Sequence, residues 1–344
     1  MRPRPISNPP NPWTTSAIDW LGEPPLAQVE VYEDATREIL SHNDSPDVGF
    51  RWSVNPYRGC AHACAYCYAR PTHEYLGFGA GTDFDTRIAA KLRAPELLRD
   101  AFERPSWRGE RVAFSGVTDC YQPLEASLRL TRGCLEVCAA YRNPVSIITK
   151  APLVERDLDV LSALAARGAA EVTISLPFLD KDRARALEPG AAAPARRLET
   201  VRRLAAAGIP TAVLLAPVIP GLNDEEIPRA LAAAAEAGAT HAGWVLLRLP
   251  GSVAAVFEER LRAALPERAE RVMHRIRESR GGALYDGRFG VRQRGGGALA
   301  AAIGALFEAG ARRAGLATLR SEDRDHGTPF RRPRPQLDLF VDAR

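Results

Sequence analysis

The sequence predicts an α/β protein built on an open partial barrel of six parallel β/α units, followed by a helical C-terminal extension. From Arg51 onward, short runs rich in β-branched and other apolar residues alternate with helical patterns, as in repeated β/α units. Six units are too few to close an eight-stranded barrel, so we expect a curved sheet with a wide lateral mouth. The expected strands cover residues 51–55, 111–117, 145–150, 171–176, 211–216 and 242–249.

Proline, aspartate and glycine mark the ends of the helices between these strands. Pro95 suits the first turn of a helix, and Asp157 stands where it can cap the next helix. Gly168, Gly208 and Gly238 stand where a C-terminal glycine belongs. These signals support the same repeated unit.

The composition changes along the chain and predicts four parts. Residues 1–48 are rich in Pro, Asn and Asp without sustained periodicity, and we expect an extended arm. Residues 49–251 form the partial-barrel core. Residues 252–318 are mostly helical, with a glycine- and arginine-rich loop at 281–297, and residues 319–344 read as a flexible tail.

The overall composition excludes fibrous and wholly disordered proteins. The 344 residues include 46 basic and 42 acidic side chains, and the net charge of +4 permits a polyanionic partner without requiring one. No apolar run approaches the roughly 20 residues that span a bilayer, and the N-terminus lacks the apolar stretch of a signal peptide. We therefore expect a cytoplasmic protein without a membrane partner. Its six cysteines are then more typical of metal binding or catalysis than of disulfides.

Three cysteines form the strongest motif in the chain. Cys60, Cys64 and Cys67 follow the first expected strand at C-x3-C-x2-C spacing. Three such thiolates can bind three irons of a 4Fe-4S cluster and leave the fourth iron open to a small chelating cofactor. The alternative is a zinc site completed by His62 or a distant cysteine, although structural zinc sites usually have four ligands from paired C-x2-C elements.

With Tyr66 before its last cysteine, this motif resembles that of the radical S-adenosylmethionine superfamily, and the resemblance extends over about residues 55–248. It implies the partial barrel of that family and an open iron that binds the amino and carboxylate groups of S-adenosylmethionine. One electron from the cluster then cleaves the cofactor to methionine and a 5′-deoxyadenosyl radical, which abstracts hydrogen from a substrate. By this resemblance Cys60, Cys64 and Cys67 hold the cluster, and the Tyr66 backbone lies near the adenine.

The ends of the next three strands resemble the spore photoproduct lyase-like branch of that family. This branch has a hydroxyl residue followed by Asp, here Thr118 and Asp119, then a Thr-Lys pair ending in Lys150, and a serine, here Ser175. The resemblance implies that Thr118 binds the methionyl amino group, Lys150 the carboxylate and Ser175 the ribose, with Asp119 in the same cofactor-binding motif. Lys150 is also one of only three lysines in the chain.

Each of these residues also has an ordinary structural explanation. Thr118 could be a turn residue, Lys150 a solvated side chain and Ser175 a residue leading into a helix. Residues 216–224 are similar to the family's backbone contact to adenine, but they also read as a proline-rich loop before a helix.

The other cysteines are harder to interpret. Spore photoproduct lyases have a hydrogen-donating cysteine just before the second-strand hydroxyl residue, where this chain has Gly116 and Val117, which puts photoproduct reversal by that route in doubt. Cys120 is our candidate catalytic residue, as a hydrogen donor to a substrate radical; the alternative is an inert buried thiol. Cys134 and Cys138, one helical turn apart, could hold an auxiliary metal with Cys120 or simply pack in the core.

Two segments suggest a nucleic-acid context. The loop at residues 285–297 combines glycines and two aromatics with Arg288, Arg292 and Arg294, so it could follow a phosphate backbone, or it could be a solvated surface loop. The tail contains apolar anchors that resemble the binding motif for the bacterial sliding clamp, and the alternative is that they fold back on their own domain. The motif consists of Gln336, Leu337, Asp338, Leu339 and Phe340.

Together these features predict a radical S-adenosylmethionine enzyme that acts on a large polymer, with DNA in repair or processing as the leading substrate. One alternative keeps the chemistry but moves the substrate to RNA, protein or a metabolite. Another is a non-catalytic iron-sulfur or zinc module recruited to DNA. The enzyme hypothesis requires a 4Fe-4S cluster, S-adenosylmethionine and an electron donor such as flavodoxin or ferredoxin.

Overall fold

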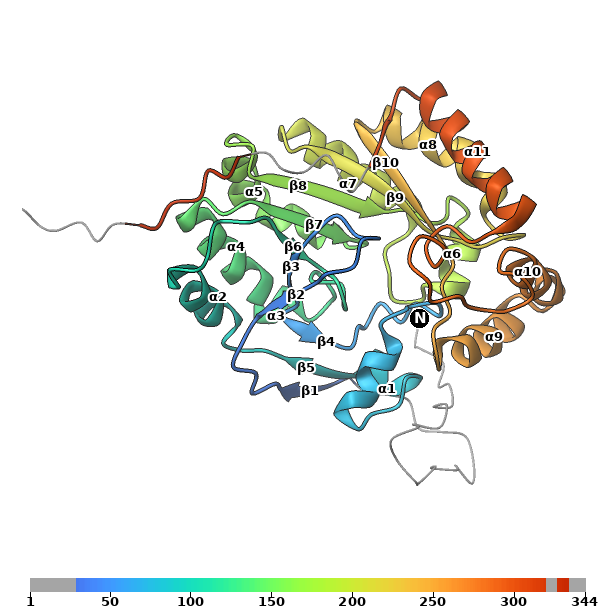
Figure 1. The fold of residues 1–344 in the computed structure, drawn as a ribbon, viewed down its shortest axis with the longest axis horizontal. Coiled ribbons are helices and arrows are strands. Elements are labelled where there is room, and N and C mark those ends of the chain that lie inside the picture. The colour runs from blue at the N-terminus through green and yellow to red at the C-terminus, as the bar shows by residue number, and fades with distance from the viewer. Residues whose placement is uncertain (1–28, 320–326, 334–344) are drawn as a thin grey trace, which may run out of the picture.

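The computed structural model describes residues 29–319 and 327–333, which contain the predicted parallel sheet (Figure 1). Its strands run in the order β11-β10-β9-β8-β7-β6-β3-β2, and every neighbouring pair is parallel except β2 with β3. All six expected strands are present, so the predicted partial barrel is confirmed. They are β3 (Trp52–Val54), β6 (Val112–Phe114), β7 (Val145–Thr149), β8 (Ala170–Ser175), β9 (Thr211–Val218) and β10 (His241–Leu246).

Helices cover the outer face of this sheet, and the inner face surrounds the barrel interior (Figure 1). The main core lies between the strands and the outer helices. Those helices are α2 (Ala94–Glu103), α4 (Leu130–Tyr141), α5 (Leu158–Ala165), α7 (Pro194–Ala206), α8 (Ile227–Glu236) and α11 (Gly297–Arg313). Shorter elements connect them: α1 (Thr82–Thr86), α3 (Glu125–Leu128), α6 (Lys181–Leu187), and the 3-10 helices η1 (Arg70–Leu76), η2 (Pro152–Asp157) and η3 (Asp224–Glu226). None of the described helices is long and apolar enough to cross a membrane.

Most of the helix-end signals read from the sequence act as expected. Pro95 lies in the first turn of α2, and Gly168, Gly208 and Gly238 adopt φ values of +66°, +73° and +98° after their helices. Asp157 precedes α5 but does not cap it with its side chain. Its buried carboxylate instead accepts a hydrogen bond from the Tyr121 hydroxyl at 2.9 Å and pairs with neighbouring arginines.

A second, three-stranded sheet was not anticipated. It has the order β1-β5-β4, from β1 (Glu30–Glu33), β5 (Arg87–Ala90) and β4 (Tyr57–Arg58). Together with β2 (Leu40–His42), it places two strands in the segment expected to be only an extended arm. Strands of two to four residues are too short to show an alternating pattern in the sequence. This sheet matters for function because β4 leads directly into the cysteine motif.

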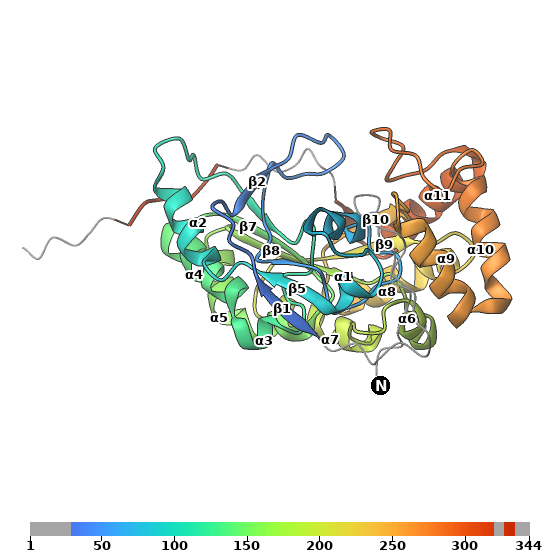
Figure 2. The same cartoon turned by 90° about the horizontal axis from the view of Figure 1, so that it is seen from below.

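The C-terminal helices α9 (Val253–Ala264) and α10 (Pro266–Glu278) lie side by side at one end of the molecule (Figure 2). Their apolar faces share a second core with the cysteine loop, in which Phe257 and Met273 pack with Cys64 and Tyr66. The extension thus supports the site from outside the barrel. The chain then forms α11 and the short edge strand β11 (Ala317–Thr318).

Part of the expected flexible tail is packed on the barrel. The Phe330 ring lies 6.0 Å from Phe102 and 6.2 Å from Tyr141, measured between ring centroids. Arg332 donates hydrogen bonds to the carbonyls of Phe102 and Arg104 at the end of α2. A Cβ at Gly109 would lie 2.2 Å from the Phe330 Cβ, so the surface is shaped around this ring. The clamp-like motif at 336–340 lies outside the described residues.

Replacing Phe330 with alanine should release this segment and leave the barrel intact, because the ring supplies its main apolar contact. We expect faster trypsin cleavage after Arg331, because Pro333 blocks cleavage after Arg332, and a loss of about 1–2 kcal/mol of unfolding free energy, since the ring is only partly buried. Mass spectrometry of timed digests measures the first effect. Phe289→Ala, at an exposed ring, is the control, and equal cleavage in both variants would contradict the packing.

Candidate active site

A cavity of about 600 Å³ occupies the barrel interior at the carboxyl ends of the strands. In parallel α/β barrels the loops at this end carry binding and catalytic groups. Every residue predicted to bind the cluster or the cofactor lines this cavity, although these residues come from four separate segments of the sequence. They are Cys60, Cys64, Tyr66, Cys67, Thr118, Asp119, Lys150 and Ser175.

Backbone hydrogen bonds fix the loop that carries the three cysteines. The Cys60 N–H donates to the Phe84 carbonyl at 2.8 Å. The buried Gln122 side chain accepts from the Ala61 N–H at 3.1 Å and donates to the Gly59 carbonyl at 3.0 Å. The loop is therefore tied both to the segment before β5 and to the end of the second β/α unit.

Two buried arginines hold the same loop from behind. Arg70 donates to the Cys64 carbonyl from Nε at 3.1 Å and from Nη2 at 2.8 Å, and Arg260 of α9 donates to the Ala63 carbonyl at 2.6 Å. Asp85 pairs with both guanidinium groups. Sequence reasoning missed this network because Arg260 is distant in the chain and belongs to an ordinary amphipathic helix pattern. It fixes the backbone on both sides of the second cysteine, Cys64.

The three thiols are close enough to influence one another's charge. Burial raises the pKa of Cys60 well above its ordinary value, and the charges of Asp119, Cys64 and Cys67 raise it further. Burial also raises the pKa of Cys64 to about 12, and Lys150 opposes this shift. Three thiolates that repel one another in a buried site are stable only when bound positive charge compensates them. This donor set therefore fits an iron-sulfur cluster.

The described residues give no support to the zinc alternative. Within residues 29–319 and 327–333, no group of three His, Cys, Asp or Glu side chains is arranged to hold a single metal ion. His62 is buried, with its Nδ1 3.4 Å from a carboxylate oxygen of Asp119. Cluster ligands each bind a different iron and need not converge on one ion.

Asp119 uses its carboxylate to organise the strand ends around it. It accepts hydrogen bonds from the Thr149 hydroxyl at 2.7 Å and from the Lys150 and Tyr121 N–H groups at 2.8 and 2.9 Å. Burial favours the neutral acid, but the interaction with His62 and these hydrogen bonds lower the pKa of Asp119 to about 2. Its contacts are those of a positioning residue for Lys150.

The depressed pKa of Asp119 predicts a pH-dependent contribution to stability. Its folded pKa lies below the ordinary value of 3.8, so the ionised carboxylate stabilises the fold by about 2 kcal/mol above pH 4. This contribution is lost as the pH falls from about 4 toward 2. Urea unfolding of the apo-protein should show a deficit for Asp119→Asn at pH 7 that shrinks below pH 4. The exposed Asp100→Asn is the control, and a deficit independent of pH would contradict the assignment.

Lys150 lies between a hydroxyl and a buried carboxylate. Its Nζ is 2.8 Å from the Ser175 Oγ, 3.8 Å from Glu188 and 5.8 Å from the centre of the Tyr66 ring. Burial would raise the pKa of Glu188, but the charges of Arg197 and Lys150 outweigh it and lower the pKa. Arg197 and the Tyr66 hydroxyl both bind Glu188, a residue that sequence reasoning missed.

Thr118 keeps an acceptor available to the cavity. Its hydroxyl donates to the Tyr57 carbonyl at 3.0 Å, and the same oxygen can still accept a hydrogen bond. The side chain is buried, which fits recognition of an ammonium group shielded from water.

The packing disfavours the catalytic role predicted for Cys120. Its side chain is fully buried in the main core and is not among the residues that line the cavity. Cys134 and Cys138 are also buried there, on the inner face of α4. Burial raises the pKa of all three thiols, as expected for inert packing residues.

The family assignment follows from a direct match to a family model. The radical SAM superfamily model matches residues 54–234, which is more than half of the chain. The chain belongs to the radical SAM superfamily. The matched residues begin at the end of β3 and contain the cysteine motif and the strands β6, β7, β8 and β9.

Relatives in sequence do not carry an assigned activity. An uncharacterised protein of Mycobacterium tuberculosis is 42% identical over 224 residues, 64% of this chain and 66% of the relative, which is just under two thirds of its length. An uncharacterised protein of Methanocaldococcus jannaschii is 26% identical over 200 residues, 58% of this chain and 72% of the relative.

Solved structures show the same fold at low identity. Spore photoproduct lyase complexed with dinucleoside spore photoproduct is 17% identical, covers 84% of this chain and 81% of its own, and gives a TM-score of 0.62. A variant of that enzyme with bound AdoMet and dinucleoside spore photoproduct gives a TM-score of 0.59 at 17% identity. The match covers 84% of this chain and 80% of the variant's chain. These similarities show that the chain shares its fold with these structures.

The arginine-rich loop is folded onto the arm at the mouth of the radical SAM core. Arg292 pairs with Asp47, which lines the cavity mouth. Arg288 pairs with Asp286 at 2.6 Å, and Arg294 donates to the Trp244 carbonyl at 2.8 Å. The three arginines predicted to contact phosphates are therefore engaged within the protein, which makes a role as free phosphate contacts less favourable.

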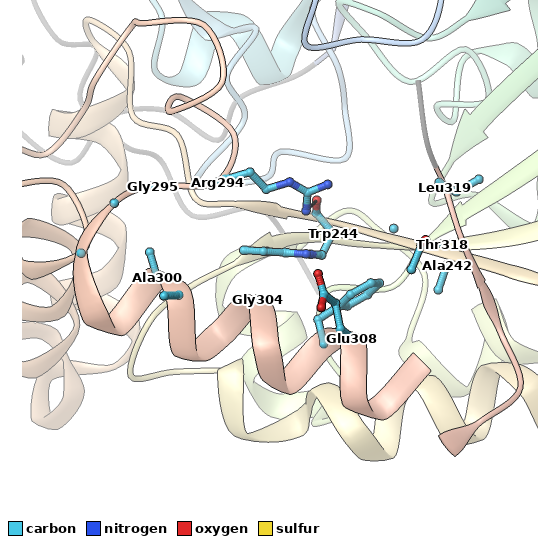
Figure 3. Close-up of a pocket in the computed structure, with 14 residues that line it drawn as sticks. Ala242, Trp244, Arg294, Gly295, Ala300, Gly304, Glu308, Thr318 and Leu319 are labelled. Carbon is cyan, nitrogen blue, oxygen red and sulfur yellow. Dashed lines mark hydrogen bonds between the residues drawn. The ribbon is translucent and has the colours of Figure 1, made fainter. Parts of the chain in front are cut away.

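A second pocket of about 570 Å³ lies between β10 and α11 (Figure 3). The Arg294 guanidinium lies 4.6 Å from the centre of the Trp244 ring, and Glu308 extends from α11 toward that ring (Figure 3). A Cβ at Gly304 would lie 3.4 Å from the indole, an ordinary van der Waals contact, so this turn of α11 packs close to the ring. Sequence reasoning did not predict this pocket.

Proposed function

We propose that this protein is a radical SAM enzyme that uses a 4Fe-4S cluster and S-adenosylmethionine to abstract hydrogen from a macromolecular substrate. The observation that carries the proposal is the convergence of three buried thiols, Thr118, Lys150 and Ser175 on one cavity. When bound, the cluster supplies one electron that cleaves the cofactor and generates a 5′-deoxyadenosyl radical. The reaction on the substrate would fall in the lyase or oxidoreductase class.

Different residues of the cavity bind the cluster and the separate groups of the cofactor. Cys60, Cys64 and Cys67 hold the cluster, while the Thr118 hydroxyl accepts a hydrogen bond from the amino group of the cofactor. Lys150 pairs with the cofactor carboxylate. The Ser175 hydroxyl, whose oxygen lies 2.8 Å from the Lys150 Nζ, binds the ribose. Glu188 is already bound by Arg197 and Tyr66, so Lys150 can turn to a ligand without leaving that carboxylate unpaired.

DNA in repair or processing is the substrate we favour. It is supported by the fold shared with spore photoproduct lyase and by the clamp-like tail. Photoproduct reversal through a cysteine before the hydroxyl residue is not part of the proposal, because Gly116 and Val117 line the cavity there and carry no thiol. RNA, a protein or a metabolite is the alternative substrate, and a non-catalytic module recruited to DNA is the alternative function.

The deciding experiment is anaerobic. The protein is reconstituted with iron and sulfide, reduced with dithionite and mixed with S-adenosylmethionine, with or without damaged DNA or RNA, and 5′-deoxyadenosine is measured by chromatography. Formation of 5′-deoxyadenosine, stimulated by DNA, is expected. Its absence from a fully loaded, reduced cluster under every condition would favour the non-catalytic module.

Replacing Lys150 with methionine should weaken cofactor binding while sparing the cluster. A hydrogen-bonded ion pair to the cofactor carboxylate is worth about 1.5–3 kcal/mol, so we expect affinity to fall roughly 10- to 100-fold. Equilibrium binding of S-adenosylmethionine to the loaded protein measures this. Lys181→Met, at an exposed lysine on α6, is the matched control, and equal affinities in the two variants would exclude the role of Lys150.

We also propose that the protein is cytoplasmic and that flavodoxin or ferredoxin reduces its cluster. Residues 336–340 would recruit the enzyme to a bacterial sliding clamp. The packing of Phe330 supports this, because it holds the segment that precedes the motif in the sequence on the surface of the barrel. Replacing Leu339 and Phe340 with alanine should abolish clamp binding in surface plasmon resonance without changing cofactor cleavage. Loss of cleavage would instead mean that the tail belongs to the catalytic unit.

A further inference from the structure

Two arginines without an ion-pair partner among the described residues lie near each other at one strand end: Arg248 lines the cavity, and Arg280 lies buried close to it. Arg248 follows β10 and lines the cavity together with Cys67 and Tyr68. Arg280 follows α10, and its Nη2 donates to the carbonyl of Leu247, the residue before Arg248, at 2.5 Å. The two guanidinium groups therefore approach the same strand end from different elements.

Three of their N–H donors are buried and unused. The Nε of Arg248 and the Nε and Nη1 of Arg280 have no hydrogen-bond partner among the described residues. Arg280 is only 5% exposed. A buried donor left unsatisfied costs about 1–3 kcal/mol, more when it is charged, so protein interiors rarely leave several together.

No carboxylate in the described part of the chain forms an ion pair with either arginine. Asp286, whose charge reaches Arg280, is already paired with Arg288 at 2.6 Å. Burial and the nearby charge of Arg248 lower the pKa of Arg280, which shows that the two like charges repel each other. An anion bound between them would remove the repulsion and satisfy the free donors.

We propose that Arg248 and Arg280 form a subsite for a phosphate group of an oligonucleotide substrate. Each phosphodiester group of an oligonucleotide presents two charged non-bridging oxygens to the forked donors of the two guanidinium groups, and the DNA substrate proposed above supplies such groups. The inference rests on the proposed function and gives it a chemical substrate class. The subsite is separate from Lys150, which we assign to the cofactor.

Neighbouring side chains fix this subsite close to the cluster loop. The Arg248 guanidinium lies 5.1 Å from the centre of the Tyr68 ring, and the Tyr68 hydroxyl donates to the Gly116 carbonyl at 2.5 Å. The carbonyl of Arg292 accepts from Arg280 at 3.0 Å. The arginine-rich loop thus contributes by holding Arg280, while its own side chains are paired elsewhere.

Binding of a labelled thymidine oligonucleotide to the cluster-loaded protein tests the subsite. The matched probe carries uncharged methylphosphonate linkages in place of phosphodiesters. Arg248→Gln should weaken binding of the phosphodiester probe about 10-fold, reduce the slope of log affinity against log salt by about one, and leave the methylphosphonate probe unaffected. Arg271→Gln, at an exposed arginine of α10, should change neither probe.

Because Arg280 also donates to backbone carbonyls, the second variant is the conservative Arg280→Lys. Lysine keeps the charge but lacks the forked geometry of the guanidinium group. We expect it to weaken binding of the phosphodiester probe only. Equal loss for both probes, or no loss, would overturn the subsite. Inorganic phosphate that competes at the affinity of the oligonucleotide would overturn the substrate class. Cofactor cleavage is measured separately without DNA, so failure of the enzyme hypothesis and failure of the subsite give different results.

Discussion

Replacing Cys64 with alanine is expected to abolish the iron-sulfur cluster. Its thiol faces the cavity, and the carbonyl of the same residue is held by Arg70, so the loop cannot bring another ligand into this position. The described residues offer no further cysteine at the cavity, since Cys120, Cys134 and Cys138 are packed in the main core. With two ligands left, we expect the visible absorption and bound iron to fall to background after anaerobic reconstitution, and cofactor cleavage to disappear.

The matched control for this experiment is Cys138→Ala, which removes a thiol of similar burial outside the cavity. It should retain wild-type iron and sulfide content. Full iron retention in Cys64→Ala would remove our assignment of the site. Metal analysis of the wild-type protein also separates the alternatives, because one zinc in place of four irons would favour the zinc module.

The sequence predicted the barrel because the strands from β7 to β10 are long enough to carry an apolar pattern, and the repeated β/α spacing also located the three-residue strands β3 and β6. β8 and β9 are mostly buried runs between helices with clear end signals, and the residues at their ends follow a family motif. The two-residue strand β4 has no such pattern, and its pairing with β5 depends on contacts between segments about 30 residues apart.

The same distinction explains which site residues were found. Cys60, Thr118 and Lys150 belong to local motifs at strand ends, where topology alone brings them together. Glu188 and Arg260 act through contacts with distant residues, and nothing in their own neighbourhood separates them from surface charges. Cys120 is close to the site in the sequence, but its side chain is packed in the main core and does not line the cavity, a placement that its local sequence does not indicate.

The network behind the cysteine loop gives the second large expected effect. Replacing Asp85 with alanine leaves the guanidinium groups of Arg70 and Arg260 buried together without a carboxylate. Removing one partner from a buried ion pair typically costs about 3–5 kcal/mol, because the remaining charge stays desolvated. We expect a loss of this size in urea unfolding of the apo-protein, together with poorer cluster retention as the Ala63 and Cys64 carbonyls lose their fixed positions.

Two further variants separate loss of charge balance from loss of packing. Glu270→Gln removes the exposed partner of Arg262 and should cost less than about 1 kcal/mol, as surface ion pairs do. Adding Arg260→Leu to Asp85→Ala removes one of the uncompensated charges, so it should recover part of the unfolding free energy. It should not restore cluster retention, because the Ala63 carbonyl still lacks its donor. Recovery of both properties would mean that Arg260 serves only the charge balance and does not position the cysteine loop.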